Sequence, residues 1–158
     1  MSKNFYITTT LPYVNAEPHI GFALEIVAAD VLARYHVLKD ETVIFNTGTD
    51  EHGLKIFREA AAHHQTPQEY VDGYADQFKA LHQLLNLSVT HFIRTTDPHH
   101  VTAAQVFWKR CLDRGDIYKK MYKVKYCVGC ELEKTESELV DGKCPLHPNK
   151  DIEVIEEE

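Results

Sequence analysis

Four residues in the last third of the sequence have the types and spacing of a metal site. They form a C-x2-C pair and a C-x2-H pair, separated by thirteen residues, at Cys127, Cys130, Cys144 and His147. Two residues between ligands let the backbone wrap a tetrahedral ion, and three thiolates with one imidazole favour zinc. Because four protein ligands leave no open position, the spacing predicts a structural Zn²⁺ site. The alternatives are iron in place of zinc, and four side chains that bind no metal.

A second group of residues, near the N-terminus, could bind phosphate. Residues 18–22 read Pro-His-Ile-Gly-Phe and stand at the predicted start of a long helix. The first turn of a helix has unpaired N–H groups and a positive dipole end, which together attract anions. His19 could donate a hydrogen bond to a phosphoryl oxygen, and Gly21 lets a phosphate or a flat ring approach the backbone. On these letters alone, a packed helix start is an equally good interpretation.

The elements predicted around these residues alternate between strand and helix. Apolar, nearly uncharged residues at 5–11 predict a buried parallel strand, and similar patterns at 42–47 and 87–94 predict two more. Apolar residues at steps of three and four predict one helical face, made by Ile20, Leu24, Val27, Val31, Tyr35 and Leu38. The alternation predicts an α/β sheet with right-handed crossovers.

Two loops are predicted to meet at one edge of this sheet. In a doubly wound sheet, ligands lie outside the carboxyl ends of the strands. The loop at 48–53 and the loop at Pro12 each follow a strand, so they should share a crevice. Thr66 and Glu69 form a capping-box pattern for a later helix that runs to about residue 85.

The composition excludes several classes of function. The chain has 17 lysines and arginines against 24 aspartates and glutamates, a net charge of −7 with neutral histidines. This balance argues against a basic nucleic-acid-coating module, although a local basic patch alternates with tyrosines at Lys119, Lys120, Lys123 and Lys125. With neither a signal-peptide core nor an apolar stretch of about 20 residues, we expect a cytoplasmic protein with no membrane partner and with reduced cysteines.

The helical pattern stops at Asp116, which predicts a domain boundary. We therefore expect one domain at 1–115 and a small zinc-binding domain at 116–158. The last residues, 152–158, alternate like a strand and finish in a charge run without a turn or cap. This ending indicates a piece of something longer.

Five segments together resemble the methionyl-tRNA synthetases, a group of class I aminoacyl-tRNA synthetases. They keep the order and spacing of the family at 10–15, 18–21, 46–53, 92–97 and the Cys/His pairs after Tyr126. The letters Gly-Thr-Asp-Glu-His-Gly at 48–53 separate this group from the enzymes for isoleucine, valine and leucine. The resemblance implies that 1–115 is the N-terminal half of a Rossmann-like catalytic domain, and that 116–158 is a truncated connective insertion carrying zinc.

The resemblance also implies a reaction and a set of site residues. ATP, with Mg²⁺, would activate L-methionine to methionyl-adenylate, and the aminoacyl group would then move to the acceptor end of tRNA(Met). His19 and Gly21 would be the catalytic residues that meet ATP, the backbone of Leu11 and the Asp50 carboxylate would hold the methionine ammonium, and Tyr13 would close the pocket. Such chemistry needs positioning and charge rather than a protein nucleophile.

The sequence departs from the family in two places. Phe22 stands where the family has a second histidine, and we expect its ring to pack against adenine in the ATP site. A weaker ATP contact is the alternative. The lysine-rich Lys-Met-Ser-Lys-Ser loop of the family has no counterpart here. The resemblance therefore implies that the missing C-terminal half of the same enzyme is a partner, and we expect the chain alone to have weak activity. A non-catalytic module that binds ATP, methionine or tRNA ends, and a small adenylyltransferase, are the other functions considered.

Overall fold

The computed structural model describes residues 3–157, and the chain divides into two compact units between Gln105 and Val106. This division falls inside a helix, α4 (Pro98–Asp113), so the predicted domain boundary after residue 115 stays a prediction. Among the described residues, no helix is both long enough and apolar enough to cross a membrane.

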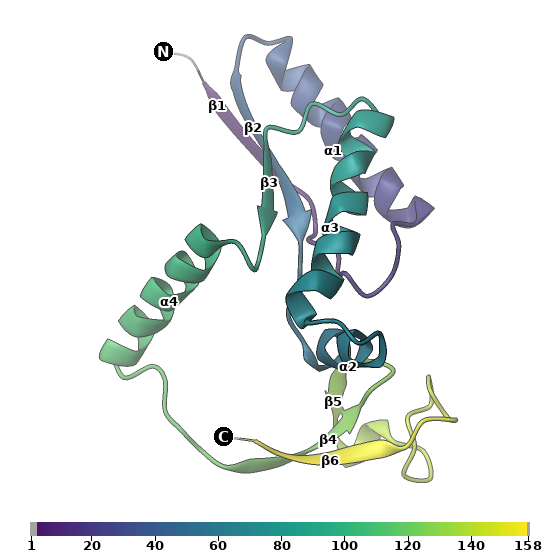
Figure 1. Ribbon diagram of the computed structural model, residues 1–158. Helices are drawn as coiled ribbons and strands as arrows, with labels where there is room; N and C mark the ends of the chain where they lie inside the picture. Colours follow the sequence, from purple (N-terminus) through teal and green to yellow (C-terminus); the bar gives the residue numbers. More distant parts are fainter. Residues whose placement is uncertain (1–2, 158) are drawn as a thin grey trace. The chain divides into compact units, whose positions relative to one another are not determined.

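The first unit is built on a parallel sheet of three strands in the order β1-β2-β3. Phe5 pairs with Val43 across the first two strands, and Thr47 pairs with Phe92 across the next two. Helices α1 and α3 lie on the same side of this sheet (Figure 1). The predicted α/β class and the parallel pairing are confirmed. The elements before α4 are β1 (Asn4–Thr8), α1 (Ile20–Val37), β2 (Thr42–Thr49), α2 (Leu54–Ala62), α3 (Pro67–Leu84) and β3 (His91–Arg94).

The hydrophobic core of this unit lies between the sheet and its helices. The buried face of α1 consists of Phe22, Ile26, Ala29, Asp30 and Ala33. The predicted face was the wrong one, because its members are exposed: Ile20, Leu24, Val27, Val31, Tyr35 and Leu38. Since apolar residues occur on every side of this helix, their periodicity cannot select the side that meets the sheet. The small alanines on the buried side let the helix backbone approach the strands.

Three strand predictions need correction. The second strand runs to Thr49 instead of residue 47, because Gly48 and Thr49 continue the pairing with β3. The third strand begins at His91 instead of residue 87, because Ser88 is bound to a helix: its N–H and its Oγ donate to Asp30 Oδ1 at 2.6 and 2.5 Å. Burial by itself would raise the pKa of Asp30, but these bonds from Ser88, together with the Arg34 guanidinium, outweigh it and lower the pKa. The first strand ends at Thr8 and is not buried throughout, since Tyr6 is 61% exposed.

The capping box of α3 is confirmed. Thr66 Oγ1 accepts a hydrogen bond from the Glu69 N–H at 3.2 Å, and Glu69 Oε2 accepts one from the Thr66 N–H at 2.8 Å. Two unpaired N–H groups at the helix start are thereby satisfied. Because this start is fixed locally, α3 begins at Pro67, where the sequence predicts.

The second unit is a small antiparallel sheet in the order β5-β4-β6. The two longer strands pair with Val124 opposite Ile155, which confirms the predicted strand near the C-terminus. The short strand β5 and the 3-10 helix that follows it were not predicted. The elements of this unit after α4 are β4 (Tyr122–Cys127), β5 (Leu132–Lys134), η1 (Glu136–Glu138) and β6 (Ile152–Glu157).

Candidate functional site

The loops that follow β1 and β2 lie side by side at the carboxyl edge of the parallel sheet. Tyr13 and Asp50 form an isolated parallel bridge. The Asp50 N–H donates to the Pro12 carbonyl at 2.9 Å, and the Val14 N–H donates to the Asp50 carbonyl at 3.1 Å. Leu11, next to Pro12, belongs to the same loop. The structure thus brings together the loops that carry the three predicted methionine contacts, while their role in binding stays a prediction.

The ring of Tyr13 lies over the backbone of Gly53. A Cβ atom on Gly53 would stand 2.4 Å from the Tyr13 Oη, and Gly53 has a φ of +143°. Both observations favour glycine, because a side chain would meet the phenol and most residues avoid this φ. Gly53 therefore lets the first loop close over the second.

A carboxylate of α1 holds the start of the first loop. Glu25 Oε1 accepts from the Thr10 N–H at 2.7 Å, and Glu25 Oε2 accepts from the Thr10 Oγ1 at 2.8 Å. This contact fixes the chain immediately before Leu11. Sequence reasoning missed Glu25, because nothing in its sequence context distinguishes it from an exposed glutamate on a helix surface.

His19 is the N-cap of α1 and remains exposed. Its Nδ1 accepts a hydrogen bond from the Gly21 N–H at 3.1 Å, so the neutral ring carries its proton on Nε2. A Cβ on Gly21 would approach the His19 ring to 3.0 Å. Gly21 therefore makes room for the imidazole to fold back as a cap, which leaves Nε2 as a donor at the positive end of the helix.

Phe22 belongs to the core rather than to the exposed start of the helix. Its ring is 7% exposed and packs edge-on against Phe78 of α3, with centroids 5.3 Å apart. The expected packing of Phe22 against adenine therefore finds no support in its position. Its role is better explained by burial, because a large apolar ring seals the contact between α1 and α3.

The four predicted metal ligands meet in the second unit. Their ligand atoms all lie within 4.8 Å of one another. Nδ1 of His147 is 3.8 Å from the Cys127 Sγ and 3.2 Å from the Cys130 Sγ, and the Cys130 and Cys144 sulfurs are 3.5 Å apart. In a tetrahedral zinc site with Zn–S of about 2.3 Å and Zn–N of about 2.0 Å, ligand atoms stand about 3.5 to 3.8 Å apart. The donor set and its spacing fit Zn²⁺.

The surroundings of these ligands support the same geometry. A Cβ on Gly129 would stand 2.4 Å from the His147 ring, so only glycine lets the imidazole lie against the first pair. Burial raises the pKa of the Cys130 thiol to about 11. Burial also opposes ionisation of Cys144, but hydrogen bonds, first with His147 and then with Cys130 and the Leu146 backbone, together outweigh it and lower the pKa of that thiol to about 6. Zinc binds cysteine as the thiolate, so its binding would be coupled to loss of the thiol protons.

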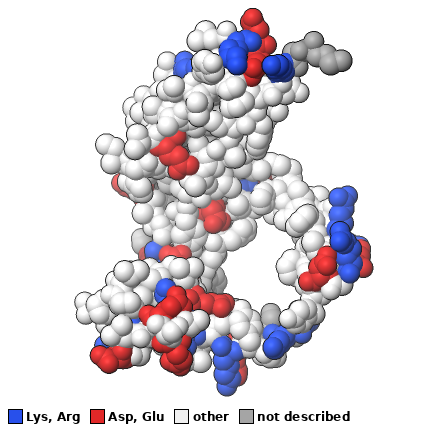
Figure 2. Space-filling model, turned by 180° about the vertical axis from the view of Figure 1, so that it is seen from behind, with Lys and Arg blue, Asp and Glu red and all other residues white. Residues whose placement is uncertain are grey.

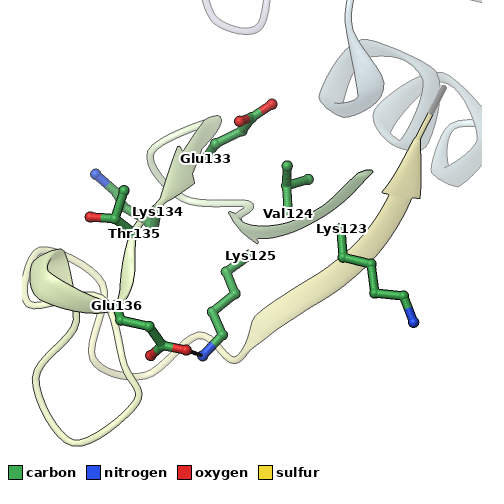
Figure 3. Close-up of a pocket in the computed structure, with 7 residues that line it drawn as sticks. All are labelled: Lys123, Val124, Lys125, Glu133, Lys134, Thr135 and Glu136. Atoms are coloured by element: carbon green, nitrogen blue, oxygen red, sulfur yellow. Dashed lines mark hydrogen bonds and ion pairs between the residues drawn. The ribbon is translucent and has the colours of Figure 1, made fainter. Parts of the chain in front are cut away.

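The lysines of the basic patch are neutralised where β4 carries them. Lys125 pairs with Glu136, and Lys123 pairs with Glu156 at 2.7 Å. Figure 3 shows Lys125 reaching Glu136 at a hollow of about 380 Å³, while Lys123 points away from it. On the face drawn in Figure 2, blue and red side chains of this unit lie next to each other. The two lysines of the patch that lie on β4 therefore belong to ion pairs and do not form an open cationic surface.

Sequence reasoning also missed Glu51 and Arg94. Glu51 is buried directly after Asp50, and Arg94 at the end of β3 binds it through two hydrogen bonds. A signal was present: an acidic residue in one strand-end loop and a basic residue at the end of the neighbouring strand can pair across a parallel sheet. The spacing alone does not say that they do.

The chain matches a known family over nearly its whole length. The family model described as tRNA synthetases class I (M) covers residues 5–156. The methionine–tRNA ligase of Thermosynechococcus vestitus is 48% identical over 154 residues, which are 97% of this chain and 29% of that protein. The chloroplastic/mitochondrial methionine–tRNA ligase of Arabidopsis thaliana is 44% identical, over 92% of this chain and 24% of that protein.

A solved structure agrees with the sequence comparison. The methionyl-tRNA synthetase of Mycobacterium tuberculosis, solved in complex with methionyl-adenylate, superposes with a TM-score of 0.89 at 40% identity. The match covers 98% of this chain and 31% of that one. The chain thus spans less than a third of the length of these relatives.

Proposed function

This chain belongs to the class I tRNA synthetases of group (M), and from this membership we propose that it forms the N-terminal part of a methionine–tRNA ligase. The whole enzyme would activate L-methionine with ATP and transfer it to the acceptor end of tRNA(Met). The family match makes the alternative of a small adenylyltransferase wrong. A non-catalytic role stays a prediction for the chain by itself, because it covers 29% of a relative's length.

The observation that carries this proposal is the meeting of the two strand-end loops. Asp50 is half-buried and held by backbone bonds to the Pro12 loop, so its carboxylate can pair with the ammonium of methionine. Leu11 would offer its backbone to the same ammonium, and Tyr13 would cover the bound amino acid. Because backbone hydrogen bonds already join the two loops, less ordering of the chain would be needed when the amino acid binds.

We propose that the start of α1 binds the phosphates of ATP. His19 Nε2–H and the N–H groups of the first turn form a positive end that suits a phosphate with its Mg²⁺. Gly21 contributes indirectly, because it lets the His19 ring adopt its capping position. Charge that develops on the α-phosphate would be stabilised here without a nucleophile. Phe22 is left out of this contact set.

We propose that Cys127, Cys130, Cys144 and His147 hold one structural Zn²⁺. When bound, the ion crosslinks the ends of β4 and the loop before β6 and supplies no reaction step. Its task would be to fix the small sheet, whose only other buried side chain among the described residues besides the cysteines is Val124. That the whole protein is cytoplasmic stays a prediction from the sequence.

The proposal is tested by methionine-dependent ATP–pyrophosphate exchange in the whole ligase. Asp50→Ala should raise KM for methionine about 10- to 100-fold, the scale of a lost charged hydrogen bond of roughly 1.5 to 3 kcal/mol. KM for ATP should change little. Asp76→Ala removes an exposed aspartate of α3 and serves as control.

Two results would count against the proposal. An unchanged KM for methionine in Asp50→Ala would remove Asp50 from the pocket. Exchange that depends on another amino acid would reject methionine as the substrate. The 158-residue chain alone is expected to give exchange near background, since a preorganised site that lacks part of its groups stabilises the transition state poorly.

A further inference from the structure

Glu51 is a fully buried carboxylate with every hydrogen-bonding direction used. Its side chain is 0% exposed. Oε1 accepts from the Thr49 Oγ1 and from the Arg94 Nε, both at 2.6 Å. Oε2 accepts from the Arg94 Nη2 at 2.9 Å and from the Thr96 hydroxyl. A buried carboxylate is tolerated only when its charge is neutralised and its oxygens are bonded, and Arg94 supplies the opposite charge and two of the four hydrogen bonds.

Arg94 connects three elements through one guanidinium. Besides its two bonds to Glu51 it donates from Nη2 to the Asp72 Oδ1 of α3 at 2.6 Å. The hydrogen bond with Glu51, together with Asp72, holds the pKa of Arg94 above its usual range, so the group stays charged. Gln68 first and Arg94 second lower the pKa of Asp72. The ends of β2 and β3 and the first half of α3 are thereby fixed to one another.

Backbone hydrogen bonds of the neighbouring residues hold the segment around Asp50 in place. The Glu51 N–H donates to the Thr95 Oγ1 at 2.9 Å, and the Thr95 N–H donates to the Thr49 carbonyl at 3.2 Å. Thr49 and Glu51 bond to each other, so their side chains lie on one side of the extended chain. Successive side chains in an extended segment leave on opposite sides, so Asp50 faces away from this network.

We propose that Arg94 is a positioning residue for methionine. Through its two hydrogen bonds to Glu51, it fixes the direction in which the Asp50 carboxylate meets the methionine ammonium. This inference rests on the proposed function and deepens it. The bidentate fork of an arginine fixes orientation, whereas a lysine holds a carboxylate only as a point charge. A displacement of about 1 Å in a binding group can cost up to about a hundredfold in activity.

The test measures exchange kinetics of the whole ligase in two variants. Arg94→Lys keeps the positive charge and loses the fork. The double variant Glu51→Gln with Arg94→Gln removes the charges of both partners, so it leaves no buried carboxylate without a cation and should fold even where Arg94→Lys does not. In each, KM for methionine should rise at least about fivefold while KM for ATP stays within about twofold, on the scale of a small misplacement. Arg34→Lys is the matched control, since Arg34 pairs with the buried Asp30 away from this loop.

A double-mutant cycle separates positioning from general weakening. If Arg94 acts through Asp50, the effect of Arg94→Lys on KM for methionine should fall below about twofold in an Asp50→Asn background. A full effect in that background would overturn the proposal. So would an unchanged KM for methionine in both variants, or an equal rise of both Michaelis constants.

Amide hydrogen exchange of the 158-residue chain keeps the inference separate from the proposed function. Arg94→Lys should speed exchange at the amides of Asp50 and Glu51 at least about tenfold without changing that of Ala60 in α2. If the unmodified ligase shows no methionine-dependent activity, the proposed function fails. Amide hydrogen exchange then still tests whether Arg94 holds the loop that carries Asp50. Unchanged exchange at these amides overturns the inference.

Discussion

At the scale of single residues, His19 combines a capping role that the structure shows with a phosphate contact that we propose. Its Nδ1 caps α1 by accepting from the Gly21 N–H, and this bond leaves Nε2–H for the proposed phosphate contact. A helix cap contributes to stability, whereas the Nε2 donor contributes only when a nucleotide is bound. One ring therefore joins the fold of the N-terminal unit to its proposed chemistry.

The two tasks can be tested with one substitution. Asparagine is a good N-cap residue but has no group at the position of the imidazole Nε2, so His19→Asn should keep the thermal midpoint within about 2 °C. In the whole ligase, kcat for pyrophosphate exchange should fall at least about tenfold, as for a lost phosphate contact. His19→Ala is the comparison and should lower both. Equal activity of His19→Asn and the unmodified enzyme would contradict this assignment.

At the scale of elements, the approach of β2 to β3 depends on Gly48. A Cβ at this position would stand 1.9 Å from the Ile93 carbonyl oxygen. The two nearest atoms belong to the Ile93 backbone, which no side-chain rotation can move aside, so the strands would have to separate. Separation would also disturb the loop that carries Asp50, which begins two residues later.

Gly48→Ala should therefore lower the free energy of unfolding by about 3 kcal/mol or more. Gly73→Ala is the matched control, because a Cβ there meets nothing within 4 Å on the exposed side of α3. It should be stabilising by roughly 0.5 to 1 kcal/mol, the usual gain for glycine to alanine within a helix. Urea unfolding followed by circular dichroism measures both. An unchanged midpoint for Gly48→Ala would show that the strands can adjust.

The contact of α3 with β3 carries a dependence on pH. His82 packs edge-on against Phe92, and within the described residues its buried Nε2 has no hydrogen-bond partner. Burial first, and Lys79 second, lower the pKa of His82 from its usual 6.5. The unfolded chain then binds a proton below about pH 6.5 that the folded chain does not, so stability falls as the pH decreases through this range.

His82→Phe should remove the part of the stability decrease at low pH that His82 causes. Between pH 7 and pH 5, its thermal midpoint should decrease less than that of the unmodified chain, because phenylalanine does not titrate and can fill the same space. His99→Gln, on the exposed start of α4, is the control and should keep the original slope. Parallel slopes for His82→Phe and the unmodified chain would mean that His82 does not carry the effect.

At the scale of the whole molecule, the two units have different sources of stability. The first contains the extended core cluster around Phe45 and Ile26. The second buries little: its buried side chains among the described residues are Val124, Cys127 and Cys144. A small sheet with so few buried groups needs a crosslink, which the proposed zinc would supply.

Metal analysis of the purified chain should accordingly give about one zinc per chain. Chelation should unfold the second unit and leave the first, seen as loss of slow amide exchange in β4 with retention in β2. Cys130→Ser should give the same pattern without chelator, whereas Cys111→Ser, outside the cluster, should retain the metal. Chain that is free of metal and fully protected in β4 would exclude a structural zinc.

The sequence by itself determined the features that depend on near neighbours. The spacing of Cys127 and Cys130, the capping box at Thr66 and the alternation of strands with helices follow from local patterns, and all appear in the structure. A ligand pair or a cap needs only the few residues between its members, so the pattern carries the information.

Only the tertiary structure decided which surfaces meet. It buried the Phe22 side of α1, which the apolar pattern on all sides could not select, and moved that ring from the expected nucleotide contact into the core. It also joined Glu51 to Arg94 across 43 residues of sequence. The physical reason is the same in both cases: burial and the pairing of distant charges depend on the partner surface, which no local pattern contains.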